Sequence, residues 1–228
     1  MDDALRSSSN LSRKVVSVAA GEAHTLALTG DGCVYSWGRG MFGRLGIGSE
    51  VDALLPVQVK CDTCSESEEK RLKLVGIAAG AYHSMALADD GSVWCWGYNP
   101  CILHAGACSV KAGGMMSLAI DNLGTLWIWG NCPQQSSSSG ESGFSLVSSF
   151  TPIPVWDFHG HTVVKVACGN EHVVALVSVG ETYEGEDLLC YSWGNNNHGQ
   201  LGLGDRESRI HPELLKHLTS ILPGLFMR

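Results

Sequence analysis

The sequence has few charged residues and no excess of positive ones. Only 17% of its 228 residues are Asp, Glu, Lys or Arg, and 23 acidic against 15 basic side chains leave a net charge of −8. Binding to nucleic acids and adhesion to anionic membranes both depend mainly on Lys and Arg. The composition therefore argues against direct nucleic-acid binding and against binding to a membrane surface.

Long apolar segments are also missing. No apolar run approaches the roughly 18 residues that a membrane-spanning helix needs, so membrane insertion is not expected. Residues 1–14 mix acids, serines and bases without an apolar stretch, which argues against a secretory signal and predicts a flexible N-terminus. A cytoplasmic or nuclear location follows as an expectation. In such a location the nine cysteines should be mostly reduced thiols.

Glycine is abundant, with 28 residues, and it marks an internal repeat. Four segments align on a glycine, at Gly21, Gly80, Gly113 and Gly169. The third residue after each glycine is His24, His83, Met116 or His172. The sixth is always alanine, at Ala27, Ala86, Ala119 and Ala175. Each segment closes on a Trp-Gly pair that begins at Trp37, Trp96, Trp129 or Trp193.

The repeat predicts small antiparallel sheets. Apolar and polar residues alternate with period two, and Asp-Gly turns at Asp31-Gly32 and Asp90-Gly91 separate the predicted strands. An alanine between two large aliphatic residues indicates a strand that is packed closely on one face. Such a sheet has no core of its own, so the units must stack. The sequence therefore predicts an all-β fold of radially arranged sheets, which is a propeller.

A second glycine motif follows the first and fourth Trp-Gly pairs. It reads Gly43-Arg44-Leu45-Gly46-Ile47-Gly48 in one and Gly199-Gln200-Leu201-Gly202-Leu203-Gly204 in the other. Together with the Gly-x-x-His-x-x-Ala-Leu and Trp-Gly motifs, it resembles the regulator of chromosome condensation repeat. The resemblance implies a propeller with seven blades of four strands each. It covers roughly three quarters of this chain.

The resemblance places a repeat domain at residues 15–217, with units near 15–60, 74–100, 108–156 and 163–217 and a non-repeat tail at 218–228. Successive Trp-Gly pairs are 59, 33 and 64 residues apart. The interval of 33 residues predicts that the second unit lacks its second half. About four recognisable repeats also predict an incomplete ring, the shortened form of a longer propeller.

Several motifs invite a chemical interpretation, and a structural one is preferred for each. A histidine at the same position in three of the four units favours a buried side chain that ties a turn to backbone carbonyls over a functional site. The tryptophans should pack between blades. Cys61 and Cys64 have the spacing of a zinc or redox pair, but an acidic run follows them and no second pair exists, so a surface loop is the better interpretation. No catalytic residues, metal site or cofactor are therefore expected.

The resemblance implies three kinds of function. The first is a protein-interaction scaffold, which we prefer. Guanine-nucleotide exchange on a Ran-type small GTPase is the second, and ultraviolet-B reception is the third. The light-sensing motif of the receptor is Gly-Trp-Arg-His-Thr, and the two positions after each repeat glycine here hold no Trp-Arg pair. An enzyme of another kind, such as a hydrolase or a metal enzyme, ranks last.

A partner is therefore expected to be a protein, a small GTPase among the options. The loops just after the repeat glycines match the partner-facing loops of the family, and the loop at residues 39–44 combines apolar and basic side chains as interfaces do. These two criteria select the predicted partner-binding residues Glu22, Ala81, Tyr82, Asn170, Glu171, Arg39, Met41, Phe42 and Arg44.

Overall fold

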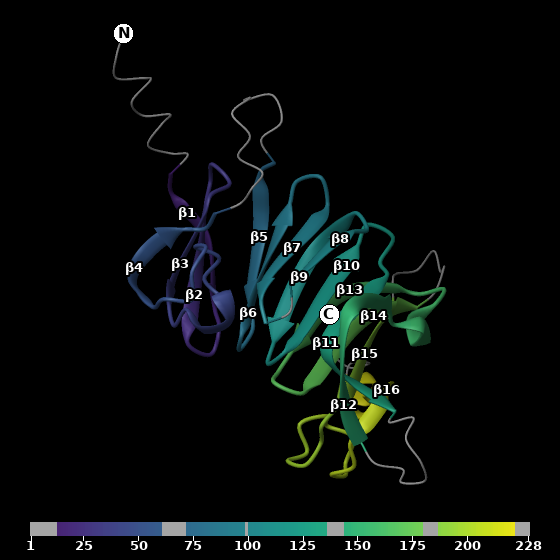
Figure 1. Cartoon of the computed structure of the whole chain (residues 1–228). Coiled ribbons are helices and arrows are strands. Elements are labelled where there is room, and N and C mark those ends of the chain that lie inside the picture. The colour runs from purple at the N-terminus through teal and green to yellow at the C-terminus, as the bar shows by residue number, and fades with distance from the viewer. Residues whose placement is uncertain (1–12, 61–71, 99, 136–143, 180–186, 222–228) are drawn as a thin grey trace. The chain divides into compact units, whose positions relative to one another are not determined.

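The computed structural model describes residues 13–60, 72–98, 100–135, 144–179 and 187–221 (Figure 1). It contains four antiparallel sheets, each of four strands that follow one another in chain order. We call the sheets blades 1 to 4. The chain also divides into two compact units that are larger than the sequence repeats, unit 1 (Met1–Ala119) and unit 2 (Ile120–Arg228). The division falls within a strand of blade 3.

The strands lie where the repeat predicts them. Blade 1 contains β1 (Val15–Ala20), β2 (His24–Thr29), β3 (Val34–Gly38) and β4 (Ala53–Gln58). Blade 2 contains β5 (Leu74–Ala79), β6 (His83–Ala88), β7 (Ser92–Gly97) and β8 (Cys101–His104). Blade 3 contains β9 (Ala107–Gly113), β10 (Met116–Asp121), β11 (Leu126–Gln135) and β12 (Phe144–Pro154). Blade 4 contains β13 (Thr162–Cys168), β14 (His172–Val179), β15 (Asp187–Gly194) and β16 (Arg209–Leu214).

Helical structure is minor in the described part of the chain. Two single-turn 3-10 helices, η1 (Met41–Gly43) and η3 (Trp156–Phe158), and one short α-helix, α2 (Lys216–Ile221), complete the elements. None of the helices in the described ranges is long and apolar enough to span a membrane.

The repeated alanine lies at the centre of its sheet, on the second strand. In blade 1, Ala27 is opposite Val18 on β1 and Tyr35 on β3. Ala86 of blade 2 has the same kind of neighbours, since it is opposite Ile77 and Trp94. Ala27 and Ala86 are 6% and 0% exposed, and each is opposite an aromatic residue of the third strand. The close packing inferred from the sequence is confirmed.

The core of unit 1 forms between blades, because one sheet cannot bury its own faces. Its buried residues come from blade 1 (Leu26, Leu28, Val34, Val59) and blade 2 (Leu74, Ala79, Ala86, Ala88). Strand β5 packs against β1 and β2, and on its other side against β9. In unit 2, β11 packs against β15 and β16. The repeat predicts that the sheets stack on one another, and this packing of sheet against sheet is observed within unit 1 and within unit 2.

The prediction that the second unit lacks its second half is wrong. Blade 2 has a fourth strand, β8, which is only four residues long and pairs with β7 in regular antiparallel register from Ser92↔His104 to Cys95↔Cys101. An antiparallel neighbour needs only a short connection. The glycine-rich loop of blades 1 and 4 is therefore dispensable for a fourth strand, although its absence shortens the Trp-Gly interval.

Candidate interaction surface

The repeat histidines of unit 1 are buried packing elements. His24 and His83 are 3% and 0% exposed, and Met116, at the same repeat position, is also fully buried. His24 Nε2 lies 2.8 Å from the Ser84 hydroxyl, and His83 Nε2 lies 2.9 Å from the Ser117 hydroxyl. In the next blade, each histidine thus contacts the serine that directly follows the equivalent position, which is His83 for Ser84 and Met116 for Ser117. The serine hydroxyl at Nε2 was not expected from the sequence, which suggested backbone carbonyls as partners.

The hydrogen bonds also determine which nitrogen of His24 carries the proton. The Ser84 hydroxyl donates to the Arg44 carbonyl at 2.8 Å, so it must accept from His24 Nε2–H. His24 Nδ1 is then unprotonated, and it is buried with no hydrogen-bond partner among the residues that the structure describes. Burial, with smaller contributions from Arg44 and His83, lowers the pKa of His24 to about 4. Burial likewise lowers the pKa of His83 to about 4, so both side chains are neutral at pH 7.

The repeat glycines provide space for these histidines. A Cβ on Gly21 would lie 2.5 Å from His24 Cε1 and 2.4 Å from the carbonyl oxygen of Gly80 in the next blade. A Cβ on Gly80 would meet His83 Cε1 at 2.2 Å, and one on Gly169 would meet His172 Cε1 at 2.3 Å. The Gly-x-x-His motif is therefore a packing motif, in which the imidazole ring fills the space that a side chain at the glycine position would occupy.

The Trp-Gly pairs lie on the third strand of each blade. Trp129 and Trp193 are buried, at 0% and 2% exposure, while Trp96 donates its indole N–H to the Arg44 carbonyl at 2.9 Å. Trp37 is half-buried. The glycine that follows has a left-handed backbone in every blade, with φ between 89° and 114°, which explains why it is glycine.

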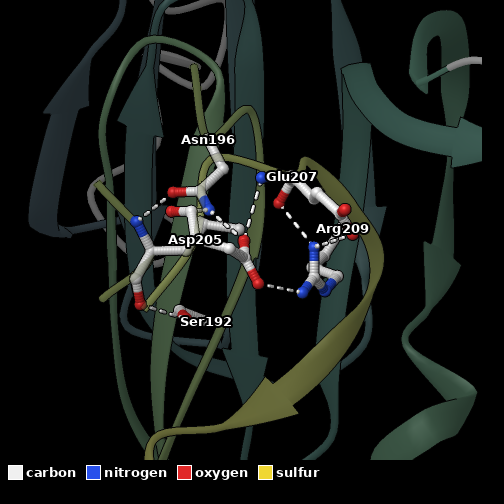
Figure 2. Close-up of polar contacts among 6 residues, drawn as sticks. Ser192, Asn196, Asp205, Glu207 and Arg209 are labelled. Atoms are coloured by element: carbon white, nitrogen blue, oxygen red, sulfur yellow. Dashed lines mark hydrogen bonds and ion pairs between the residues drawn. The ribbon is translucent and has the colours of Figure 1, made fainter. Parts of the chain in front are cut away.

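The second glycine motif of blade 4 is a tight loop held by polar contacts (Figure 2). Asn196 Nδ2 donates to the carbonyl and to the carboxylate of Asp205, both at 3.1 Å, and Asn196 Oδ1 accepts from the Leu201 N–H at 2.9 Å. Ser192 donates to the Leu201 carbonyl at 2.7 Å. Asp205 also pairs with Arg209 at 2.7 Å. Hydrogen bonding from the Glu207 N–H, and then from Arg209, lowers the pKa of Asp205 below its ordinary value.

Blade 1 has the same loop with different side chains. The turn bonds match, since the Gly43 N–H donates to the Gly40 carbonyl as the Gly199 N–H does to the Asn196 carbonyl. Met41, Phe42 and Arg44 stand where blade 4 has Asn197, His198 and Gln200. The shared backbone does not require the apolar and cationic side chains of blade 1, so their presence needs another explanation.

Arg44 is a buried cation held by backbone and aromatic groups. It is 1% exposed, and its guanidinium donates to the Met41 carbonyl at 2.9 Å and to the Ala81 carbonyl at 2.8 Å. Its Cζ lies 4.9 Å from the centroid of the Tyr82 ring, a cation–π contact. Its Nη2 is buried and has no hydrogen-bond partner within the described part of the chain. Burial, and then the charge of Arg39, lowers the pKa of Arg44 from its ordinary value.

Three rings gather beside this guanidinium, and we call Phe42, Tyr82 and Tyr98 the aromatic cluster. Phe42 lies 5.5 Å from Tyr82 and 5.6 Å from Tyr98, centroid to centroid, and Tyr82 lies 6.5 Å from Tyr98. All three contacts are edge-to-face. Phe42 and Tyr98 are nonetheless 42% and 41% exposed. The cluster therefore forms an ordered apolar surface that water still reaches.

Phe42 adopts a backbone conformation that is costly for a bulky residue. Its φ is +65°, and it is the only non-glycine residue with positive φ among the described ranges. The left-handed region costs an L-residue roughly 1–2 kcal/mol. His198, at the same place in the blade 4 loop, does not share it. The left-handed backbone is therefore a feature of Phe42 and its exposed ring, and the turn that blades 1 and 4 share does not require it.

The structure brings together four of the predicted partner-binding residues, Phe42, Arg44, Ala81 and Tyr82. Met41, at 39% exposure, continues the same loop, while Glu22 and Arg39 are exposed. Asn170 and Glu171 belong to blade 4 in unit 2, where the Glu171 carboxylate accepts from Asn195 Nδ2 at 2.8 Å. Tyr98 was not among the predicted partner-binding residues. It directly follows Trp96-Gly97, at the position that Arg39 has in blade 1, and this equivalence could have selected it.

Unit 2 has a separate hollow of about 430 Å³ between β11, β12 and β16. Trp156 at its edge is 70% exposed, and Asp157 lies 3.1 Å from His211 Nδ1. Across the described residues no group of three His, Cys, Asp or Glu side chains is arranged to hold a metal ion. Cys61 and Cys64 lie outside those residues.

Comparison with known proteins matches these repeats to one family. Two models described as regulator of chromosome condensation (RCC1) repeats match residues 31–87 and 189–222, and 15–44, 74–101 and 163–200, which together exceed half of the chain. The ultraviolet-B receptor UVR8 of Arabidopsis thaliana is 30% identical over 92% of this chain. The chain spans only 36% of that receptor.

Solved structures agree on the fold. Human WBSCR16 has a TM-score of 0.70 at 24% identity, covering 89% of this chain and 53% of its own. Yeast RCC1 (Prp20), solved with Kap60, has a TM-score of 0.66 at 22% identity, covering 89% of this chain and 49% of its own. The glycine, histidine and Trp-Gly geometry, the four-stranded blades and the matched residues lead to one conclusion: the chain belongs to the RCC1 repeat family and has an RCC1-type propeller fold.

Proposed function

We propose that the chain is a protein-binding module and that the aromatic cluster of unit 1, with Met41, is its binding surface, which the buried Arg44 supports from beneath through its contacts with Ala81 and Tyr82. The observation that carries the proposal is Phe42, an exposed ring on a left-handed backbone. Strained backbone of this kind persists where the surroundings hold it in place, and it is concentrated at functional positions. The fold is consistent with this role, since RCC1-type propellers serve in general as protein-interaction scaffolds.

The chemistry of the surface supports a protein ligand. Aromatic residues, Met and Arg are the side chains enriched at protein interfaces, and clustered aromatics with Arg dominate their binding energy. The edge-to-face contacts and the backbone bonds of Arg44 hold the surface in place before binding, which lowers the entropy cost of association. Yeast RCC1 gives a precedent, having been solved bound to Kap60.

Binders selected from a displayed protein library against the full chain test the proposal. Phe42→Gly removes the ring and also relieves the left-handed strain, so the variant should fold while binders lose at least about 30-fold in affinity, as for a hot-spot side chain. The matched control is His198→Gly in the equivalent loop of blade 4, which should leave affinity unchanged. Failure to enrich any binder, or binders that ignore Phe42→Gly, would contradict the proposal.

Exchange activity on a small GTPase is the second candidate, because binding of yeast Prp20p to Gsp1p has been characterised. Exchange requires a partner face that grips the GTPase and disturbs its nucleotide. This chain spans only 49% of the solved yeast RCC1. We expect no acceleration of GDP release from a Ran-type GTPase, measured with a fluorescent GDP analogue and with yeast RCC1 as the positive control. A reproducible several-fold acceleration by this chain would favour the exchange function.

Ultraviolet-B reception is the least supported of the three. The positions of the receptor's sensing Trp-Arg pair hold Glu22-Ala23, Ala81-Tyr82, Gly114-Met115 and Asn170-Glu171 in this sequence. Tyr82 lies next to a guanidinium in unit 1, but that guanidinium belongs to Arg44 in a different blade. The chain therefore lacks the chromophore pair by which the family resemblance implies light sensing.

A further inference from the structure

Blade 2 places two cysteines directly opposite each other on neighbouring strands. Cys95 of β7 and Cys101 of β8 are register partners in the antiparallel ladder, the pair closest to the connection between the two strands. Directly opposed residues have Cβ atoms about 4.5–5.5 Å apart and project from the same face of the sheet. The Cys101 thiol is hydrogen-bonded to that of Cys95. The two sulfur atoms are therefore neighbours in the reduced protein.

Both thiols are accessible to a small oxidant. Cys95 and Cys101 are half-buried, whereas Val93 and Leu103, two residues further along the same face, are 0% and 9% exposed. The cysteines thus mark the end of the buried face, where solvent begins to reach it. None of the seven cysteines in the described residues is in a disulfide.

We propose that Cys95 and Cys101 are a modification site, a thiol pair that peroxide oxidises reversibly to a disulfide joining β7 to β8. The Cys101 thiolate attacks one peroxide oxygen, the O–O bond breaks, and Cys101 becomes a sulfenic acid; the departing hydroxide takes up the proton that the Cys101 thiol released and leaves as water. The Cys95 thiol sulfur then attacks the sulfenic sulfur, the S–O bond breaks, and the departing hydroxyl takes up the Cys95 thiol proton and leaves as a second water. Two thiols are oxidised and one hydrogen peroxide is reduced to two waters.

The surroundings favour Cys101 as the attacking group. Its hydrogen bond with Cys95 lowers the pKa of Cys101. Burial instead raises the pKa of Cys132 to about 12 and raises that of Cys190. Because the thiolate is the reactive form, Cys132 and Cys190 should remain reduced under conditions that oxidise Cys101.

The expected disulfide is a labile one. It closes a very short loop, so it constrains the unfolded chain little and contributes little to global stability. Half-exposed cross-strand bonds are also readily reduced, which suits a reversible modification. Its direct effect is local, because the bond links the strands on either side of Tyr98. Any effect on ligand affinity rests on the proposed function, whereas the thiol chemistry does not.

Fragment mapping of the native full-length chain tests the proposal. After treatment with hydrogen peroxide and blocking of residual thiols, chymotrypsin cleaves at Trp96 and Tyr98 and separates the two cysteines. We expect a Cys95–Cys101 cross-linked fragment, a loss of two of the nine thiols, and recovery of both after treatment with reduced glutathione. The cross-linked fragment should persist in Cys108→Ser, which removes an exposed thiol of β9, and disappear in Cys101→Ser.

Three results would overturn the inference: the two cysteines stay unlinked, Cys101 links to Cys108 instead, or the link forms only after denaturation. The wild-type fragment map decides the question even if Cys101→Ser fails to fold. The readout is a covalent mass, so it is independent of any ligand. A failed binding experiment with Phe42→Gly therefore contradicts the proposed function and leaves this inference standing.

Discussion

Replacing Gly21 with alanine is expected to destabilise unit 1 by about 3 kcal/mol or more, a large fraction of the stability of a small domain. The new Cβ would lie 2.4 Å from the Gly80 carbonyl oxygen and 2.5 Å from Cε1 of His24. Neither group can move easily, since the Gly80 carbonyl accepts from the Glu22 N–H at 3.3 Å and His24 is 3% exposed. Urea denaturation followed by tryptophan fluorescence measures the loss.

Gly43→Ala is the matched control for this prediction. Gly43 also lies in unit 1, and a Cβ there would meet no atom within 4 Å. Its φ of +71° still makes alanine unfavourable, by roughly 1–2 kcal/mol. The loss of stability in Gly21→Ala therefore reports the close approach of the new Cβ to its neighbours, whereas the loss in Gly43→Ala reports backbone strain alone. Equal losses of stability in both variants would show that the glycine in the repeat motif does not serve to accommodate the histidine ring.

Acidification from pH 7 to pH 5 is expected to lower the free energy of unfolding of unit 1 by about 4 kcal/mol, about 2 kcal/mol for each of His24 and His83. The pKa of each histidine falls from 6.5 to about 4 on folding, mainly through burial. Between these values the unfolded chain binds more protons than the folded one. The stabilisation is therefore complete above pH 6.5 and is lost as the pH falls toward 4.

Urea midpoints measured at intervals between pH 7 and pH 4 test this prediction. Asp31 and Asp90 of unit 1 also have a lowered pKa, but they act in a different pH range. Hydrogen bonds from Thr29 and Ser92 move the pKa of these two carboxylates below its ordinary 3.8. The exposed His161→Gln variant should keep the wild-type pH profile. Midpoints that stay constant from pH 7 to pH 5 would mean that the buried histidines do not remain neutral in the folded protein.

Much of the fold follows from local pattern. Strands β1, β2 and β3 follow the period-two alternation, and the predicted Asp31-Gly32 turn lies between β2 and β3. Alternation, Asp-Gly turns and the central alanine are local signals, because strand periodicity and turn geometry depend on neighbouring residues. Strand β8 was missed because its pattern is too short to be recognised, and only pairing with β7 makes it a strand.

The candidate surface was predictable only in part. Phe42 and Arg44 were selected by composition and Ala81 and Tyr82 by their place in the repeat, but nothing in the sequence connected the two groups. Their meeting depends on the stacking of blade 1 on blade 2, which carries the Arg44 guanidinium to the Ala81 carbonyl. Tyr98 joins them for the same reason, from a third segment.

The sequence alone therefore determined the family and the strand order within a blade, because these depend on residues near one another in the chain. The tertiary structure decided which blade supplies each histidine's partner, which side chains form the aromatic cluster, and that Cys95 faces Cys101. Those relations depend on strand register and on the packing of one blade against the next. Register and packing are set by many weak contacts between distant residues, which no single motif encodes.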